Sequence, residues 1–359
     1  MSWSSLSRHM NESVLALQAA LAEHLPWHGA RLSFLAQFLL ALFKVRSVNL
    51  AELATGFGGK AQVASNYKRL QRFFRSFGID YDVLARLLVR LFPVGEGPWY
   101  LTLDRTHWKF GKTEINFLVL GIAYQGMALP VMWTVLDKAD NSDTEERTAL
   151  LQRFVRQFGQ TRIQALLADR EFVGRHWFAW LQAQGIPFHI RLKRNTRIPN
   201  AWNMPMRADV LFSPLKPGQS SLLQGRRPVW GCFVHLCALR LDDGDLFLIA
   251  SSGAPPQEAF TAYARRWEIE TLFGALKSRG FNFEDTHLTH PDRLGKLLAL
   301  LALAFAWTYR TGQALAERQP IPLKKRSSAP SNPSSAMAST SSAPSSSTGP
   351  TAGLISSAC

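Results

Sequence analysis

The amino-acid sequence predicts a mixed α/β protein with an all-helical N-terminal part. In residues 1–95, apolar side chains recur at the three-to-four-residue spacing of amphipathic helices. From Trp99 onward, short apolar runs typical of buried strands alternate with further helical segments. The change occurs near Pro93 to Pro98, where Val-Gly-Glu-Gly separates the two patterns. A chain of 359 residues is long enough for two or three domains.

The N-terminal part is predicted to contain five helices, at residues 12–23, 31–46, 50–55, 62–77 and 81–92. The fourth is the most informative, because its two sides differ in chemistry. Its predicted apolar stripe comprises Val63, Tyr67, Leu70 and Phe74, and its other side carries Lys68, Arg72 and Arg75. No acidic residue occurs between Glu52 and Asp80. A basic helix face can be plain solvated surface, but this one favours contact with a polyanion.

Beyond Trp99 the predicted elements are three strands, a helix, a strand, a helix and a strand. Their predicted bounds are 99–104, 115–125, 129–137, 144–158, 163–169, 174–184 and 188–193, with Gln125-Gly126 as a turn between the second and third strands. This order is that of a ribonuclease-H-like fold. It places the first and fourth strands side by side in one sheet.

Two carboxylates follow apolar runs in this part of the chain. Asp104 ends the run that begins at Trp99, and Asp169 ends the run that begins at Ile163. An Asp at a strand end is also ordinary turn chemistry. On neighbouring strands, however, the two carboxylates can share a cation, and Mg²⁺ prefers oxygen ligands of this kind.

A third acid lies on a helical segment farther along the chain. Tyr263, Arg266, Glu270 and Lys277 occur at helical offsets 0, 3, 7 and 14, which keeps them within about 60° of one another. A carboxylate flanked by two cations and a phenol suits a phosphodiester held beside a metal ion. Each member also has a structural interpretation, since Arg266 and Glu270 can pair at i,i+4 and Lys277 can be solvated. Trp267 adjoins this face and either stacks on an unpaired base or packs in the core.

These motifs resemble the three catalytic blocks of the acid-triad (DDE) transposases of bacterial insertion sequences, of the insertion-sequence-four type. The resembling segments are LDRTHWKFGK at 103–112, LLADREFVG at 166–174 and the Tyr-x2-Arg-x3-Glu-x6-Lys signature. The resemblance extends over residues 67–325.

The resemblance implies a DNA transposase that works by a cut-and-paste route of nicking, hairpin formation, hairpin opening and strand transfer. It implies that Asp104, Asp169 and Glu270 hold two Mg²⁺ ions, or Mn²⁺ in their place. It also implies that the terminal phosphates of the transposon end are bound by Tyr263, Arg266 and Lys277, with Trp267 beside them. The implied partners are double-stranded transposon-end and target DNA, and a second copy of the chain in the synaptic complex.

The domain division that we expect has five parts. They are a helical DNA-binding domain at 1–95, the first part of the catalytic core at 96–195, a β-rich insertion at 196–253, the last part of the core with the Glu270 helix at 254–320, and a tail at 321–359. Within the insertion, runs at 229–241 and 246–250 form a hairpin across the loop 242–245. Trp202 and Trp230 either pack inside the insertion or meet DNA bases.

Composition supports a nucleic-acid partner. The formal net charge is +15 and the pI is about 10.2. The longest apolar stretches are shorter than the roughly 20 residues that span a bilayer, and the N-terminus lacks a secretory signal pattern, so we expect no membrane association. The expected location is the bacterial cytoplasm, at the nucleoid.

The tail is almost wholly Ser, Ala, Pro, Thr and Gly after residue 326. It is expected to be disordered, and the abrupt change in composition suggests a frameshifted or truncated terminus. Two other functions therefore stay open at this stage. One is a transposition-defective relative that binds DNA as an inhibitor, and the other is a structure-selective nuclease.

Overall fold

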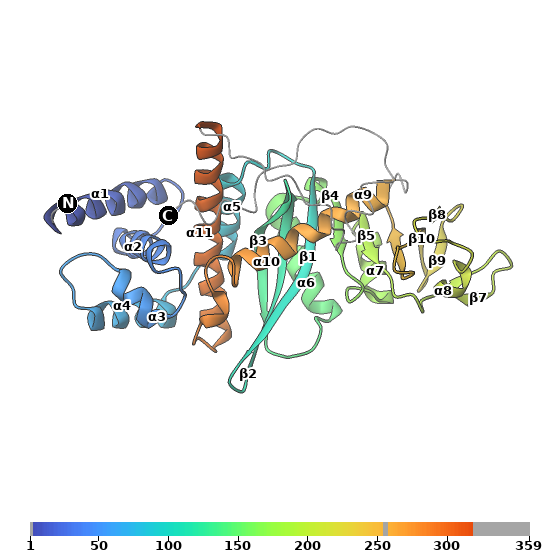
Figure 1. Ribbon diagram of the computed structural model, residues 1–359, viewed down its shortest axis with the longest axis horizontal. Coiled ribbons are helices and arrows are strands. Elements are labelled where there is room, and N and C mark those ends of the chain that lie inside the picture. The colour runs from blue at the N-terminus through green and yellow to red at the C-terminus, as the bar shows by residue number, and fades with distance from the viewer. Residues whose placement is uncertain (1–2, 254–257, 319–359) are drawn as a thin grey trace.

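The computed structural model describes residues 3–253 and 258–318. Helices occupy one end of the molecule, a mixed sheet the middle, and the strands of residues 196–253 the other end (Figure 1). This arrangement confirms the mixed α/β class and the helical N-terminal region, and it is compatible with a ribonuclease-H-like fold. The tail predicted at 321–359 lies outside the described residues.

All five N-terminal helices predicted from the sequence are present. They are α1 (Trp3–Ala22), α2 (Gly29–Val45), α3 (Leu50–Gly56), α4 (Val63–Ser76) and α5 (Tyr81–Leu91). Side-chain caps start three of them. His28 accepts from the Ala30 amide at the start of α2, Asn49 accepts from the Ala51 amide at the start of α3, and Asp80 accepts from the amides of Asp82 and Val83 at the start of α5. Helix α1 begins well before the predicted residue 12.

Helix α4 is rotated relative to the prediction. Leu70 and Phe74 are buried as expected, but Val63 is 50% and Tyr67 37% exposed. Phe73 takes their place in the core, where its ring stacks on Phe34 with centroids 4.4 Å apart. The stacking of Phe73 on Phe34 therefore sets which face of α4 is buried, and Val63 and Tyr67 are left exposed. The face with Lys68, Arg72 and Arg75 is exposed as expected.

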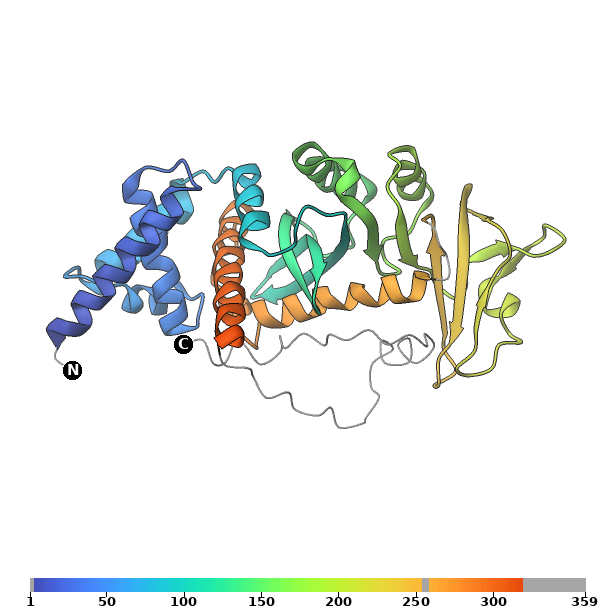
Figure 2. The ribbon, with the colours of Figure 1, turned by 90° about the horizontal axis from the view of Figure 1, so that it is seen from above.

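The central elements occur in the predicted order. They are β1 (Trp99–Phe110), β2 (Thr113–Tyr124), β3 (Met127–Leu136), α6 (Thr144–Phe158), β4 (Ile163–Ala168), α7 (Arg175–Ala183) and β5 (Phe188–Arg191). Strands β1, β4 and β5 run parallel, and β2 and β3 are antiparallel to their neighbours. Gln125 and Gly126 form the turn between β2 and β3 with positive φ angles. Helices α6 and α7 cover one face of the sheet, and the helical segment that carries Glu270 crosses the other (Figure 2).

Strand β1 is longer than predicted, which corrects the position of Asp104. The parallel pairing of β1 with β4 stops at Leu103, opposite Ala168, but pairing with β2 continues to Phe110. The extra length is stabilised by Trp108, whose ring packs against Phe283 at 4.8 Å. Asp104 therefore lies at the edge of the parallel sheet but in the middle of its own strand.

The segment predicted as a β-rich insertion contains β6 (Arg197–Pro199), β7 (Pro205–Arg207), α8 (Ala208–Leu211), β8 (Ser220–Leu222), β9 (Arg227–Val229), β10 (Cys232–Arg240) and β11 (Leu246–Ser251). Strand β11 pairs with β5 and with β10, so the main sheet continues into this segment in the order β3-β2-β1-β4-β5-β11-β10-β8. The predicted strand 229–241 is broken, because Trp230 and Gly231 adopt positive φ and turn β9 back onto β10.

The two tryptophans of this segment differ. Trp230 packs edge-on against Phe178 of α7, with centroids 5.4 Å apart. Trp202 is 78% exposed at the turn between β6 and β7, so the core-packing interpretation was wrong for it. The Asn200 side chain accepts hydrogen bonds from the Trp202 and Met204 amides. These bonds fix the turn so that Trp202 lies at its outer end, in solvent.

The helical segment with Glu270 is not one regular helix. Helix α9 (Ala259–Ala264) passes through a 3₁₀ turn, η3 (Arg265–Trp267), into α10 (Glu268–Leu276). Lys277 lies just beyond the end of α10, with a non-helical ψ of −125°. The predicted common face therefore holds for Tyr263, Arg266 and Glu270 but not for Lys277.

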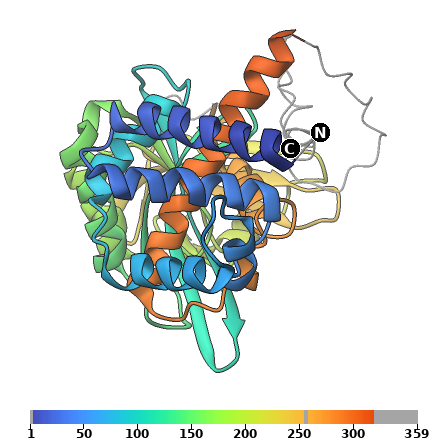
Figure 3. The same ribbon diagram turned by 90° about the vertical axis from the view of Figure 1, so that its left-hand side faces the viewer.

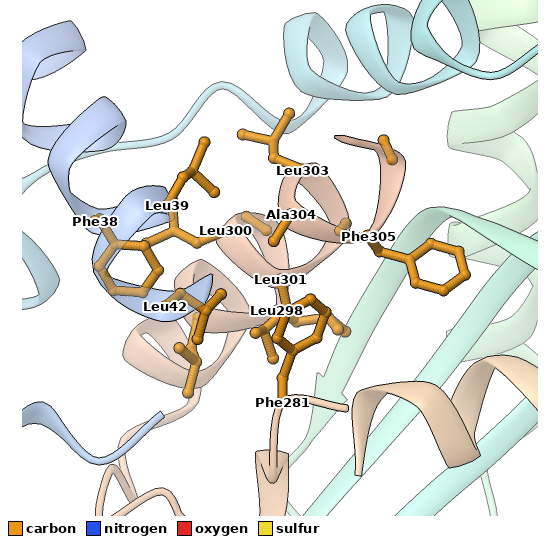
Figure 4. Packing of buried hydrophobic residues seen from close by; sticks show 14 of the residues in the cluster. Phe38, Leu39, Leu42, Phe281, Leu298, Leu300, Leu301, Leu303, Ala304 and Phe305 are labelled. Atoms are coloured by element: carbon orange, nitrogen blue, oxygen red, sulfur yellow. The ribbon is translucent and has the colours of Figure 1, made fainter. Parts of the chain in front are cut away.

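The long helix α11 (Pro291–Arg318) contacts α2, α4 and α5 on one side and β3 of the sheet on the other, and it runs behind the N-terminal helices in the view of Figure 3. Leu298, Leu301 and Phe281 lie opposite Phe38 and Leu42 of α2 in one apolar cluster (Figure 4). Within the described residues, no single helix is long and apolar enough to cross a membrane; only the bent pair α2 and α3, at 102°, passes that test together by length and composition.

Candidate active site

The sheet register brings two of the predicted acids to one edge. Leu103 of β1 pairs with Ala168, the last residue of β4, so Asp104 within β1 and Asp169 just after β4 lie at the same edge. Ala168 also pairs with Ile190 of β5, which places Arg191 next to Asp169. Adjacent strands are about 5 Å apart, so both carboxylates and one guanidinium share this edge.

Arg266 connects this edge to Glu270. Its Nη1 donates to Asp104 Oδ2 at 3.2 Å and its Nη2 donates to Glu270 Oε1 at 2.8 Å. The side chain is 3% exposed, and its guanidinium lies 4.1 Å from the centroid of the Trp267 ring. The planar guanidinium can reach two acceptors at once, so one buried cation holds carboxylates from β1 and α10.

Asp169 is contacted by a phenol and a second guanidinium. The Tyr263 hydroxyl donates to Asp169 Oδ1 at 3.5 Å, and Arg191 Nη1 lies 3.9 Å from the same oxygen. Tyr263 is fully buried and packs edge-on against Phe247 at 5.4 Å. The predicted residues Asp104, Asp169, Tyr263, Arg266 and Glu270 thus form one contiguous group.

The environment of Asp104 disfavours its charge. Burial raises the pKa of this carboxyl to about 7, and the negative charges of Glu171 and Asp169 act in the same direction. Arg266 and the Arg105 amide, which donates to Asp104 Oδ1 at 2.8 Å, oppose the rise. The carboxyl therefore sits where additional positive charge would favour its ionised form.

A second ion pair, which sequence reasoning missed, supports the site. Arg105 donates from Nε and Nη2 to the two carboxylate oxygens of Glu171, at 2.9 and 3.2 Å. The same guanidinium donates to the side-chain oxygens of Asn116 and Asn141. These contacts tie β1 to the loop after β4, so they fix Asp104 relative to Asp169. The available signal was that Arg105 and Glu171 lie beside the two acids with opposite charge.

Comparison with known proteins identifies the family. The family model described as a transposase DDE domain matches residues 95–307, more than half of the chain. The chain belongs to this family. It is therefore a DNA transposase, an enzyme that binds DNA, and transposases with this domain generally use divalent metal ions.

Among solved structures, the transposase is similar to a piggyBac transposase in a synaptic complex with hairpin DNA, determined by cryo-EM. The sequence identity is 11%, the match covers 88% of this chain and 80% of the other, and the TM-score is 0.41. No curated protein matches the chain.

The transposase offers donor chemistry that fits a divalent cation. Carboxylate oxygens from Asp104, Asp169 and Glu270 are the ligands that Mg²⁺ and Mn²⁺ prefer. Within the described residues, however, no three His, Cys, Asp or Glu side chains are close enough together to hold a metal ion. Arg266 lies between two of the acids and supplies positive charge there. The three carboxylates therefore fit a divalent cation by their chemistry. In this structure, Arg266 neutralises the charge of Asp104 and Glu270 instead.

The remaining predicted residues of the transposase lie apart from the acids. Lys277 pairs with Glu284 at 2.7 Å, and its ammonium lies 5.3 Å from the Trp108 ring centroid, beside the outer half of β1. Trp267 is partly buried and covered by the Arg266 guanidinium on one side. Lys68, Arg72 and Arg75 are on α4, in the helical part at the other side of α11.

The neighbouring acid Glu268 points away from this group. It pairs with Arg265 at 3.5 Å and packs near the turn between β2 and β3, and burial raises its pKa to about 7. The contact between Glu270 and Arg266 has no counterpart at Glu268 in the described residues. The geometry therefore favours Glu270 as the third acid.

Proposed function

We propose that this transposase carries out cut-and-paste transposition of an insertion sequence of the insertion-sequence-four type, with Asp104, Asp169 and Glu270 as its acid triad. One observation carries the proposal. Arg266 bonds to both Asp104 and Glu270, and Tyr263 of the same helical segment reaches Asp169. Acids from three distant parts of the sequence are thereby linked through the Tyr-Arg-Glu signature.

Two Mg²⁺ ions, or Mn²⁺, would be held by these three carboxylates. When bound, such ions activate a nucleophile and stabilise a leaving oxygen in phosphodiester chemistry. The chain's own contribution is to hold the carboxylates in place. The Arg105–Glu171 pair fixes the β1 and β4 edge, and the stacked Arg266 fixes the helix relative to it.

The DNA-binding residues in this proposal fall into two groups. In the first group, Arg266 and Tyr263 contact a phosphate beside the acids, a role supported by the bidentate hydrogen bonds that guanidinium and phosphate form. Trp267, which the Arg266 guanidinium covers, and Lys277, just beyond the end of α10, also contact the DNA in this proposal. Lys68, Arg72 and Arg75 face solvent on α4 and neutralise phosphates of the transposon end.

The domain organisation and partners follow the same proposal. Residues 1–95 bind the transposon end, 96–195 and 254–320 form the catalytic core, and 196–253 is inserted into it. Two copies of the chain hold paired transposon ends in the synaptic complex, in the bacterial cytoplasm at the nucleoid.

The test is a cleavage assay on a plasmid that carries the coding region with its own flanking DNA. Asp104→Ala, Asp169→Ala and Glu270→Ala should each abolish Mg²⁺-dependent cleavage and leave DNA binding close to that of the wild type. Glu268→Gln is the matched control, two residues from Glu270, and should keep cleavage. Cleavage by Glu270→Ala would contradict the triad, and cleavage without joining to target DNA would favour a nuclease instead.

A further inference from the structure

A basic cavity lies beside the candidate active site. Its volume is about 460 Å³, and it is formed by the ends of β4 and β5, the start of β11 and the end of β7. The charged residues that line it are Arg170, Arg191, Lys193, Arg194, Arg207 and Asp245. Arg207 is offset by Asp209, to which it donates two hydrogen bonds. Four cations therefore face one carboxylate, that of Asp245.

Arg191 is shared between the cavity and the candidate active site. It follows Ile190, which pairs with Ala168, and so it lies beside Asp169. Its guanidinium lies 3.9 Å from Asp169 and 3.8 Å from Asp245, and it covers the Phe247 ring at 4.9 Å. With adjacent strands about 5 Å apart, the cavity begins about 10 Å from Asp104.

Asp245 neutralises this cavity only weakly. Its carboxylate lies 3.8 Å from Arg191 and 4.0 Å from Arg194, distances too long for hydrogen bonds. Arg194 is 70% exposed, and exposed ion pairs of this kind contribute little to stability. Within the described residues, Lys193 and Arg170 form no ion pair within 4.0 Å. The cations are therefore available to an anion that forms shorter contacts.

We propose that this cavity binds backbone phosphates of the DNA strand that leads to Asp169, and that Asp245 is a resident counter-anion which the phosphates displace. The inference rests on the proposed function, because it takes the substrate at Asp169 to be DNA. A phosphate accepts charge-assisted hydrogen bonds at about 2.7–2.9 Å from guanidinium groups, closer than Asp245 approaches. A strand in contact with Asp169 meets Arg191 next and then Lys193 and Arg194.

The test measures binding of a fluorescein-labelled single-stranded oligodeoxynucleotide to the full chain across a salt series. Asp245→Asn should tighten binding about fivefold, as expected when a weak competing ion pair is removed. Asp242→Asn is its matched control, with the same charge change in the same loop, and should have a smaller effect. Lys193→Gln should lower the slope of log K against log salt by about 0.7, whereas Lys216→Gln, an exposed lysine outside the cavity, should not.

Several outcomes overturn the inference. Equal affinities for Asp245→Asn and Asp242→Asn, or equal slopes for Lys193→Gln and Lys216→Gln, would show that no phosphate occupies the cavity while leaving the proposed function intact. Stabilisation of Asp245→Asn by inorganic phosphate without any gain in oligonucleotide affinity would assign the cavity to free phosphate. If the wild-type chain binds no DNA, the proposed function fails together with the inference.

Discussion

Arg266 donates a hydrogen bond to Asp104 at 3.2 Å, although 162 positions separate the two residues in the sequence. The guanidinium is buried and also bonds to Glu270. A buried ion pair contributes little net stability by itself, but removal of one partner leaves the other charge uncompensated. Arg266 is therefore the residue whose replacement should disturb the candidate site most directly.

Replacement of Arg266 by Lys should reduce cleavage at least tenfold, because an ammonium group cannot reach two carboxylates in the planar arrangement of a guanidinium. Arg266→Gln should reduce it further and destabilise the fold by about 3 kcal/mol, through loss of the partner of Asp104. Plasmid cleavage and urea denaturation measure the two effects. Arg265→Gln, a change to the adjacent and more exposed arginine, is the control. Equal effects of Arg265→Gln and Arg266→Gln would contradict the assigned role.

The Arg105–Glu171 pair should matter both for stability and for the acids beside it. Glu171→Gln should destabilise the fold by about 1–3 kcal/mol, because Arg105 is only 10% exposed and loses its charged partner. Cleavage should fall as well, since the pair holds the edge that carries Asp104 and Asp169. Glu114→Gln breaks the exposed pair with Lys109 on the same hairpin and should change stability by less than about 1 kcal/mol. Similar unfolding midpoints for the two variants would rule out the support role.

Local patterns predicted the elements best where the chain carries its own boundary signals. Helix α6 runs from Thr144 to Phe158, the predicted bounds, because Asp143 and Glu146 form a capping box at its start and Gly159 ends it with positive φ. Asp104, Asp169 and Glu270 were found from short motifs, and the sheet register brings the first two together.

The sequence-based predictions were wrong where tertiary contacts determine the length of an element or the position of a side chain. Strand β1 continues past Asp104 because Trp108 packs on Phe283, a residue far along the chain. Lys277 leaves the helix face because α10 ends one residue earlier, and its charge is taken up by Glu284. Neither contact has a local sequence signal. The Arg105–Glu171 pair did have a signal, two opposite charges beside the predicted acids, but only the register of β1 and β4 brings these charges into contact.

The exposed face of α4 should govern a large part of the salt dependence of duplex DNA binding. Changing Lys68, Arg72 and Arg75 together to Gln should lower the slope of log K against log salt by about 2.7, at roughly 0.9 for each lost phosphate contact. The fold should survive, because all three side chains are exposed. Arg69 is left unchanged, since it donates to Gln37 and Asn66.

The control for this variant removes the same charge from other exposed helix positions, with Arg86, Arg90 and Arg156 changed to Gln. Anisotropy titrations of a labelled duplex over a salt series compare the two variants. If both lower the slope equally, α4 is ordinary solvated surface, and the duplex-binding face lies elsewhere.

His189 should make the stability of the transposase fall in acid. It is 6% exposed on β5, and burial lowers its pKa from 6.5 to about 4. Between pH 4 and pH 6.5, the unfolded chain binds a proton at His189 that the folded chain does not bind. The stability that comes from keeping His189 neutral is therefore complete above pH 6.5 and is lost as pH falls through 4. The loss is roughly 3 kcal/mol at 1.36 kcal/mol per pH unit. His189→Gln should remove this part of the pH dependence in urea titrations between pH 4 and 7, whereas His107→Gln, at an exposed position, should retain it. Parallel stability curves for the wild type and His189→Gln would show that His189 is not protonated on unfolding in this range.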